Sequence, residues 1–396
     1  GGDLEASIAL TGQVAGRIEE VLGVREIILS AKRETMVKFK ERLYIPNNAC
    51  LVVSGDVNVT EAVALAEKGW GQPHWPAEYG GRDATMLQWV VYEEEYFHAG
   101  APGRASANGT SMLAPTLFAH GTEEQLARIL PKMASGEEIW AQAWSEPESG
   151  SDLASLRSTA TRVDGGWKLN GQKIWSSRAP FGDRGFGLFR SDPEAQRHKG
   201  LTYFVIDMHG PGVEARPLRQ MTGQAEFNEV YFTDARIPDA HRLGAVGDGW
   251  RVAMTTLMNE RSALGGSGNR RGAGPISDAV GLWAARPDLR TPVLRDRLTQ
   301  LWLRAEAQRL TSERSRATVG VGGPGPEDSI GKMVGAELNQ QMYEWCMDFL
   351  GPEGILYHTY NPAEDADWRG PIQQRFLRSR ANTIEGGTSE VMRNIL

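Results

Sequence analysis

The sequence predicts an α+β protein in which helices are followed by strands and then by helices again. Residues 139–243 contain alternating apolar positions typical of strands, whereas helical patterns precede them and resume from Asp248. Segregated runs of this kind favour separate helical and β regions over a doubly wound sheet. We therefore expect an atypical N-terminal segment 1–68, a helical domain 69–138, a β domain 139–243 and a C-terminal helical domain 244–396.

The composition is that of a globular protein with an acidic balance. A chain of 396 residues, 40% of them apolar, can bury a sizeable core in two or three domains. The 43 basic residues against 50 acidic ones argue against nucleic acid as a partner. Cys50 and Cys346 are too few for a disulfide framework, and no apolar run reaches the roughly 18 residues that could span a membrane. We expect a soluble protein of a reducing compartment, the cytoplasm.

The first 138 residues combine two kinds of sequence pattern, an α/β segment and a helical region. Residues 1–68 mix helical patterns with a strand-like run, ACLVVSGDV, which indicates an α/β segment. After the Pro/Gly-rich loop GWGQPHWPAEYGG, helical patterns run from Met86 to Phe97 and through TSMLAPTLFAHG and EEQLARILPKMASG. Each of the last two segments ends in a Gly, which suits a helix C-cap.

The β region begins with an expected hairpin. In GGWKLNGQKIWSS, two alternating runs meet at Asn170–Gly171, the dipeptide that favours a type I′ turn. Further strands are expected in LTYFVIDM, GVEARPLRQM and FNEVYFTDARIP. Three long helices should follow, in GWRVAMTTLMNERSALGG, PVLRDRLTQLWLRAEAQRLTSERSRATV and DSIGKMVGAELNQQMYEWCMDFLG.

Two segments beside the β region are candidate ligand contacts. AWSEPESGSDLASL, residues 143–156, offers hydroxyls and backbone N–H groups in a loop of small residues, which suits the edge of a flavin or nucleotide. A plain turn between domains is the alternative. KIWSS, residues 173–177, places an aromatic ring and two hydroxyls at a strand end, although Trp175 is equally consistent with a core residue at a hairpin edge.

Other motifs are weaker. GVGGPG, residues 320–325, has the spacing of a dinucleotide fingerprint, but a helical pattern precedes it, so a surface loop is the better interpretation. The seven His residues show no metal-ligand spacing, and we expect no metal site.

Glu260 occupies an unusual position on the expected helix 249–264. At 100° per residue, it lies on one face with Ala253, Leu257 and Leu264. A carboxylate among apolar side chains is either paired with a cation or has a raised pKa, which a general base requires. From the residues alone, both a base and an ion pair, for example with Arg261, remain open.

Five segments together resemble the acyl-CoA dehydrogenase family: GWGQPHWPAEYGG, WSEPESGSDLASL, NGQKIWSS, RQMTGQAEFNEVYFTDARIP and IEGGTSEVMRNIL. The resemblance covers about Gly69 to the C-terminus. It implies a helical domain, a β domain and a C-terminal four-helix bundle, with FAD held in a dimer or tetramer. By this likeness, FAD would be contacted by Gln142, Trp144, Ser145, Gly150, Ser151, Trp175, Ser177, Thr388 and Glu390.

The resemblance implies flavin-dependent α,β-dehydrogenation of an acyl-CoA thioester to the trans-2-enoyl-CoA. A Glu would remove the α-proton while hydride passes from the β-carbon to flavin N5, and an electron-transferring flavoprotein would accept the electrons. The alternative is a non-catalytic or partial-site structural subunit of a heteromeric acyl-CoA dehydrogenase.

The position of the base divides the family. Many members place it immediately before a Gly-Thr pair, where this chain has Gly386; Glu385 falls one residue early. A second group places it on a helix, as the Glu of a Glu-Arg pair, which Glu260–Arg261 matches. We therefore predict Glu260 as the base. The acyl-CoA would be contacted by Ser151, Leu257, Met258, Arg261 and Gly386.

Two departures from the family pattern bear on assembly. The Gly-rich cofactor loop is reduced to LGPEGIL, residues 350–356, and no Arg-x-x-Phe-Gly segment follows Arg270, which makes a heteromeric assembly conceivable. In addition, residues 1–68 resemble a segment of the M16 metallopeptidases without their zinc motif, which indicates a fused or chimeric N-terminus, with a genuine extra module as the alternative.

Overall fold

The computed structural model describes only part of the chain. The described residues are 69, 71–85, 88–89, 91–92, 106–264, 271–318, 327–356 and 370–396, and nothing is said of the side chains of 261–264, 316–318 and 327–328. Three expectations fall wholly or largely outside these residues: the segment 1–68, the helix from Met86 to Phe97 and the loop 320–325.

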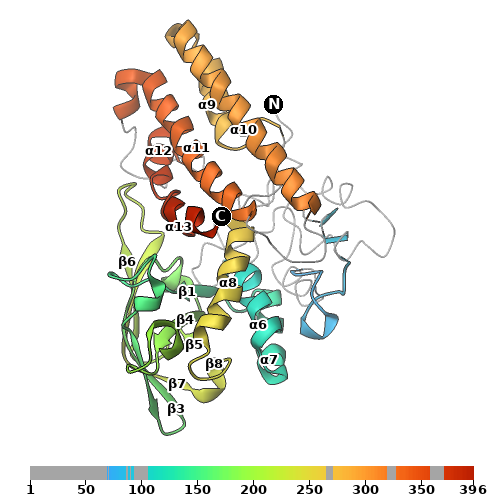
Figure 1. Cartoon of the computed structure of the whole chain (residues 1–396), viewed down its shortest axis with the longest axis vertical. Helices are drawn as coiled ribbons and strands as arrows, with labels where there is room; N and C mark the ends of the chain where they lie inside the picture. The colour runs from blue at the N-terminus through green and yellow to red at the C-terminus, as the bar shows by residue number, and fades with distance from the viewer. Residues whose placement is uncertain are drawn as a thin grey trace, which may run out of the picture. The chain divides into compact units, whose positions relative to one another are not determined.

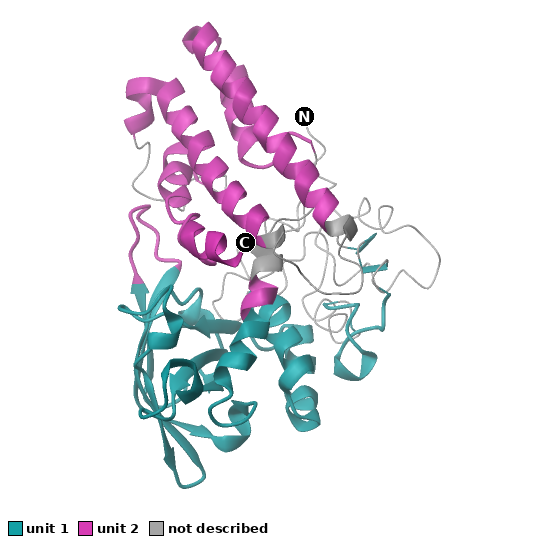
Figure 2. Cartoon of the chain, viewed as in Figure 1, with its two compact units in different colours: residues 1–217, 227–256 teal, residues 218–226, 257–396 magenta. Residues whose placement is uncertain are grey.

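The described residues form two compact units (Figure 2). The first contains the described residues up to Pro217 together with Phe227–Thr256, and the second contains Leu218–Glu226 and Leu257–Leu396. Helix α8 (Gly249–Leu264) begins in the first unit and ends in the second.

Short helices precede the sheet in the first unit. They are η4 (Ala77–Tyr79), the π-helical η5 (Asn108–Leu113), α6 (Ala114–His120) and α7 (Glu123–Ser135). A capping box starts α7, because the Thr122 hydroxyl accepts from the Gln125 N–H and the Gln125 side chain accepts from the Thr122 N–H. Gly136 ends it with φ 76°, the left-handed C-cap that the sequence predicts, whereas Gly121 after α6 is extended at φ −75°.

The described residues of the first unit also form one mixed eight-stranded sheet, most of whose strands are labelled in Figure 1. Its order is β6-β7-β3-β2-β4-β5-β8, and β1 pairs in parallel with β4. The strands are β1 (Trp140–Ala143), β2 (Thr159–Val163), β3 (Gly166–Lys173), β4 (Arg184–Arg190), β5 (Leu201–Asp207), β6 (Val213–Leu218), β7 (Phe227–Pro238) and β8 (Arg242–Leu243). Phe189, Phe204 and Phe232 pack in its core beside Trp167.

The prediction of a hairpin turn at Asn170–Gly171 is wrong. Strand β3 continues through these residues, and the turn between β2 and β3 lies earlier, at Asp164–Gly165, where Gly165 has φ 76°. Asn170 is instead paired across the sheet. Its side-chain Nδ2 donates to Asp234 Oδ1 over 3.0 Å, and its Oδ1 accepts from the Asp234 N–H over 2.8 Å, beside a shift in the β3–β7 register. The dipeptide therefore forms a bulge.

We expect that a side chain at position 171 would destabilise the fold. It has φ 141°, and a Cβ there would lie 2.2 Å from the Ser158 hydroxyl oxygen. We expect Gly171→Ala to lower the free energy of unfolding by about 1–3 kcal/mol, measured by urea denaturation. Gly281→Ala is the control, because a Cβ at this helical glycine meets nothing within 4 Å. Equal stability of the two variants would contradict the expectation.

The second unit is helical. Its elements are the end of α8, α9 (Pro275–Ala285), η10 (Pro287–Leu289), α10 (Pro292–Thr318), α11 (Glu327–Leu350), η11 (Gly351–Ile355), α12 (Ile372–Ser379) and α13 (Ser389–Ile395). Helix α11 packs against α9, α10, α12 and α13, and its buried Trp345, Cys346 and Phe349 belong to the core of this unit.

The predicted α+β fold class is confirmed, because the helices and the mixed sheet occupy separate stretches of the chain. Among the described helices, none combines the length and the apolar character that crossing a membrane requires. In the same residues, no three His, Cys, Asp or Glu side chains gather in a way that would hold a metal ion.

Candidate active site

The loop that follows β1 carries four of the predicted cofactor contacts. Trp144 is buried and packs edge-on against Phe186 and Tyr203, with ring centroids 5.8 and 5.5 Å away. Its Nε1 is also buried and has no hydrogen-bond partner among the described residues. Ser145 follows and is half-buried, while Gly150 and Ser151 are exposed. The Trp144 ring is therefore packed against two other aromatic rings, and its N–H group lies near a loop that contains the exposed residues Gly150 and Ser151.

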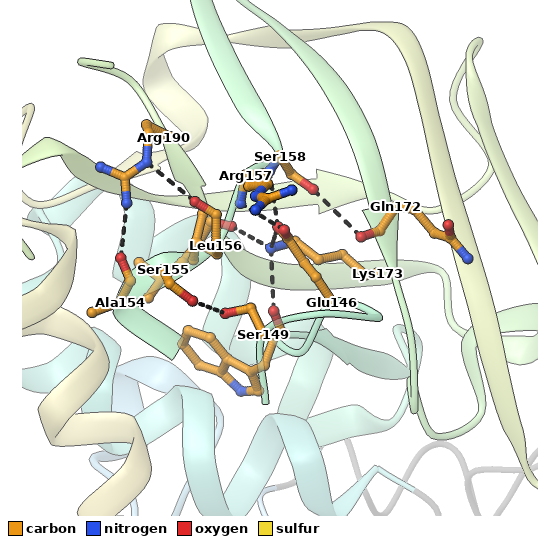
Figure 3. A network of polar contacts seen from close by, with 12 residues as sticks. Glu146, Ser149, Ala154, Ser155, Leu156, Arg157, Ser158, Gln172, Lys173 and Arg190 are labelled. Atoms are coloured by element: carbon orange, nitrogen blue, oxygen red, sulfur yellow. Dashed lines mark hydrogen bonds and ion pairs between the residues drawn. The ribbon is translucent and has the colours of Figure 1, made fainter. Parts of the chain in front are cut away.

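A buried ion pair holds this loop on the sheet (Figure 3). The Lys173 ammonium at the end of β3 is fully buried and donates to Glu146 Oε1 over 2.9 Å. It also donates to the carbonyl oxygens of Trp144, over 3.2 Å, and Leu188, over 2.8 Å. All three N–H bonds of the ammonium are thus used, and two of them end on the loop.

Glu146 extends the network into the second half of the loop. Its carboxylate accepts the N–H of Arg157 over 2.6 Å and that of Ser158 over 2.9 Å. Burial alone would raise its pKa, but Lys173 and the Arg157 N–H outweigh burial and hold the pKa of Glu146 below its usual value. The loop from Trp144 to Ser158 is consequently fixed at both ends by one charged pair.

The sequence analysis missed this pair. A signal was present, because Lys173 occupies the same alternating positions of β3 as the buried Trp167 and Leu169. A lysine that points into a core requires a carboxylate partner, and the acidic loop beside the strand supplies it.

The strand end after Lys173 lies beside the same loop, since the Ile174 N–H donates to the Ser145 carbonyl over 2.9 Å. Trp175 has φ 62°, and 51% of it is exposed, so it is not the core residue that was the alternative interpretation. Ser176 is buried, and its hydroxyl has no hydrogen-bond partner among the described residues. Ser177 is half-buried.

The first unit thus brings seven predicted cofactor contacts onto two neighbouring segments. They are Gln142, Trp144, Ser145, Gly150, Ser151, Trp175 and Ser177. The exposed Trp175 ring offers a flat apolar face, while the Trp144 N–H and the Ser176 hydroxyl are buried and have no hydrogen-bond partner in the described part of the chain. A planar heteroaromatic ligand with hydrogen-bonding atoms at its edge fits this arrangement.

The predicted base lies on the second half of α8. Ala253 on the same face is completely buried, whereas Leu257 and Glu260 are half-buried, and Met258 is 44% exposed. Glu260 is close enough to Lys332 of α11 for the two charges to interact. The side chains of Arg261 and Leu264 lie outside the described residues, so the alternative interpretation, an ion pair between Glu260 and Arg261, is not tested.

In the C-terminal segment, Glu385 is held by other side chains. Arg378 donates to its two carboxylate oxygens over 3.1 and 2.9 Å, and Asn382 donates to it over 2.8 Å. Gly386, the next residue, has φ 62°, a left-handed conformation that disfavours any residue with a side chain. The Glu385 carboxylate therefore forms an ion pair with Arg378, and the backbone conformation at position 386 favours glycine.

Thr388 and Glu390 begin the last helix. The Thr388 hydroxyl caps α13 by accepting the Val391 N–H over 3.1 Å. Glu390 has a side chain that is 78% exposed, and its own backbone N–H and the Thr388 hydroxyl lower its pKa. Thr388, Glu390, Gly386, Leu257, Met258 and Glu260 all belong to the second unit.

Comparison with known proteins covers nearly the whole chain. Models of the acyl-CoA dehydrogenase family match its N-terminal domain to residues 30–137, its middle domain to residues 141–235 and its C-terminal domain to residues 247–396. The family match thus begins within the segment 1–68, earlier than the sequence motifs indicate. The resemblance of that segment to metallopeptidases stays a prediction.

Similar proteins of known family also support membership of the acyl-CoA dehydrogenases. The chain is 39% identical to the acyl-CoA dehydrogenase IpdE1 of Mycobacterium tuberculosis, over 84% of each protein. It is 41% identical to the acyl-CoA dehydrogenase FadE34 of the same organism over 83% of this chain, but that match spans only 44% of the length of FadE34.

Solved structures share the fold. The Tcur3481-Tcur3483 steroid ACAD matches with a TM-score of 0.72 and 27% identity, covering 91% of this chain and 94% of the other. The ChsE4-ChsE5 complex from Mycobacterium tuberculosis matches with a TM-score of 0.68 and 26% identity, over 84% and 86% of the two chains. The chain belongs to the acyl-CoA dehydrogenase family, a family of FAD-dependent enzymes of lipid metabolism.

Proposed function

We propose that this chain catalyses α,β-dehydrogenation of an acyl-CoA thioester to the trans-2-enoyl-CoA, with Glu260 as the base. The observation that carries the assignment is the contrast between the two candidate carboxylates. Glu385 is engaged by Arg378 and Asn382 and adjoins a glycine, whereas Glu260 is half-buried on α8, on the same face as the buried Ala253.

The role of Glu260 follows from the chemistry of the substrate. An α-proton beside a thioester is far less acidic than a carboxylic acid, so an ionised carboxylate must be placed against it while other groups stabilise the developing enolate. Glu260 takes the α-proton onto its carboxylate oxygen, which converts the carboxylate to a carboxylic acid. We also assign the half-buried Leu257, on the same face of α8 as Glu260, and the partly exposed Met258 to the acyl-chain contacts.

The residues of the first unit fit FAD. The Trp144 N–H and the Ser176 hydroxyl are buried donors without partners among the described residues, and Trp175 offers an exposed aromatic face. FAD, when bound, supplies the acceptor that takes the β-hydrogen as hydride, so that loss of the α-proton completes the Cα–Cβ double bond. We assign Gln142, Ser145, Gly150, Ser151 and Ser177 to the same contact surface of the first unit, and we propose Thr388 and Glu390 as further FAD contacts.

A bulky acyl group is the proposed substrate class. One similar structure is a steroid ACAD, and Leu257, about one helical turn before Glu260 on α8, is apolar. A one-electron carrier, an electron-transferring flavoprotein, would then reoxidise the flavin. Because a second similar structure is a complex of two named proteins, we also propose that this chain works within a heteromer. A partial-site subunit is the second candidate function.

Anaerobic bleaching of the purified protein by a panel of acyl-CoAs tests the proposal. We expect a yellow protein whose flavin absorbance is lost within seconds with bulky or branched acyl-CoAs, and at least about tenfold more slowly with short linear ones, since each missing methylene contact costs about 1–3 kcal/mol. A yellow protein that no acyl-CoA bleaches would contradict catalysis. A colourless protein that copurifies with a homologous subunit would support the partial-site alternative.

A further inference from the structure

Strand β7 has one extra residue relative to β3 near the middle of their pairing. Leu169 pairs with Ala235, but Gly171, two residues further along β3, pairs with Phe232, three residues back along β7. Asp234 lies within this span of β7 and has φ 51°, a left-handed conformation. Asp is one of the few residues other than glycine that adopt this conformation readily, because its short polar side chain can form local hydrogen bonds. The first bulge therefore contains a residue that suits it.

A second change of register occurs at the end of β3, and here the extra residue is on the other strand. Lys173 pairs with Val230. Two residues further along, a continued register would place Trp175 opposite Asn228. Instead, the Ser176 N–H donates to the Asn228 carbonyl over 3.0 Å, and Trp175 has φ 62°. A left-handed conformation is an outlier for a bulky residue, and it persists only where the surrounding structure holds it.

The second bulge turns the Trp175 side chain outward. The side chains of Leu169 and Lys173 are completely buried, and regular alternation along β3 would send Trp175 in the same direction. Trp175 is instead 51% exposed, and its ring packs edge-on against Phe227 of β7, with the ring centroids 5.8 Å apart. The strained backbone and the exposed aromatic face are therefore two aspects of one local structure.

Asn228 holds this structure from the neighbouring strand. Its carbonyl accepts the Ser176 N–H, and its side-chain Nδ2 donates to the Ser176 carbonyl over 3.0 Å. Asn228 is buried, with only 2% of it exposed. On the other side of Trp175, the Ile174 N–H donates to the Ser145 carbonyl over 2.9 Å. The backbone is thus anchored on both sides of the strained residue, and Asn228 supplies two of these three hydrogen bonds.

We propose that Asn228 is a positioning residue of the cofactor site, which holds the second bulge and thereby presents the Trp175 ring to FAD. The inference rests on the proposed function, because Trp175 is assigned there as an FAD contact. Without the Nδ2 hydrogen bond, Trp175 is free to relax toward the backbone conformations that a bulky residue prefers. The ring then has to be ordered when FAD binds, which weakens binding.

The test is the equilibrium release of FAD on dilution of the holoenzyme, followed by the fluorescence of free FAD. Trp175→Ala should raise the Kd for FAD about tenfold. Asn228→Ala should raise it about 3–10-fold, and so should Asn228→Leu, which keeps the buried volume. When either Asn228 substitution is added to Trp175→Ala, we expect less than about a twofold further change, because its effect acts through the ring.

Gln172→Ala is the matched control. It removes another side-chain hydrogen bond between the same two strands, from Gln172 Nε2 to Glu229 over 2.9 Å, and should leave the Kd for FAD unchanged. If the Asn228 substitutions leave the Kd unchanged, or raise it equally with and without the Trp175 ring, the inference is wrong and the FAD contact of Trp175 stands. An unchanged Kd in Trp175→Ala, or a wild type without flavin, would instead overturn the proposed cofactor contact and the inference with it.

Discussion

Glu260→Gln is expected to slow anaerobic flavin reduction by about 10²–10⁴-fold at neutral pH, because a general base contributes that much and an amide cannot accept the α-proton. The substitution preserves the size of a half-buried side chain, so the protein should remain folded and yellow. Stopped-flow absorbance of the flavin under saturating acyl-CoA measures the effect directly. Unchanged flavin absorbance before mixing shows that the cofactor site is intact.

Glu385→Gln provides the control for this prediction. It removes the candidate carboxylate of the C-terminal turn, and it breaks a partly exposed ion pair with Arg378 that is worth about 0–1 kcal/mol. We expect the flavin of this variant to be reduced within several-fold of the wild-type rate. Loss of reduction in Glu385→Gln, with reduction retained in Glu260→Gln, would show that the base is assigned to the wrong carboxylate.

Glu146→Gln should destabilise the protein by about 3–5 kcal/mol at pH 7, because it leaves the buried Lys173 ammonium without its counter-charge. Urea denaturation followed by tryptophan fluorescence measures the change. Glu148→Gln is the matched control in the same loop. Its ion pair with Arg157 has an N–O distance of 2.8 Å, but the two side chains are 72% and 80% exposed, so we expect a loss of about 0–1 kcal/mol.

The same pair predicts a pH dependence. Because the pKa of Glu146 is lowered in the folded protein, its contribution is present above the unfolded pKa of about 4.3 and is lost as pH falls through the folded value. The difference between wild type and Glu146→Gln should therefore shrink below about pH 4. The double variant Glu146→Gln/Lys173→Met should regain part of the lost stability. A double variant less stable than Glu146→Gln would contradict the isolated-charge explanation.

Long elements were predictable from the sequence, and one tight turn was not. Strand β7 runs from Phe227 to Pro238, as its alternating pattern predicts, because alternate side chains enter the core on either side of a break at Thr233–Asp234. The region around Asn170–Gly171 contains two turn dipeptides six residues apart, and local preference alone does not choose between them. The side-chain pairing of Asn170 with Asp234, 64 residues further along, decides the choice.

The candidate site was predictable in part for a similar reason. Motif positions such as Trp144, Trp175 and Thr388 stand out locally, through residue type and neighbouring hydroxyls. The lysines that hold these segments do not stand out in the sequence. Lys173 and Lys332 donate hydrogen bonds to carbonyl oxygens that are distant in the chain, and only the tertiary fold brings these groups together. A lysine at a core-facing position was the available clue, and its partners follow from the tertiary fold.

The loop between Trp144 and Ser158 is ordered by contacts that the chain makes with itself. Lys173 and Glu146 satisfy one another and the loop backbone without help from a ligand. The conformational entropy of ordering this loop is therefore lost during folding. If the loop forms part of the FAD site, as we propose, cofactor binding would not have to order it again.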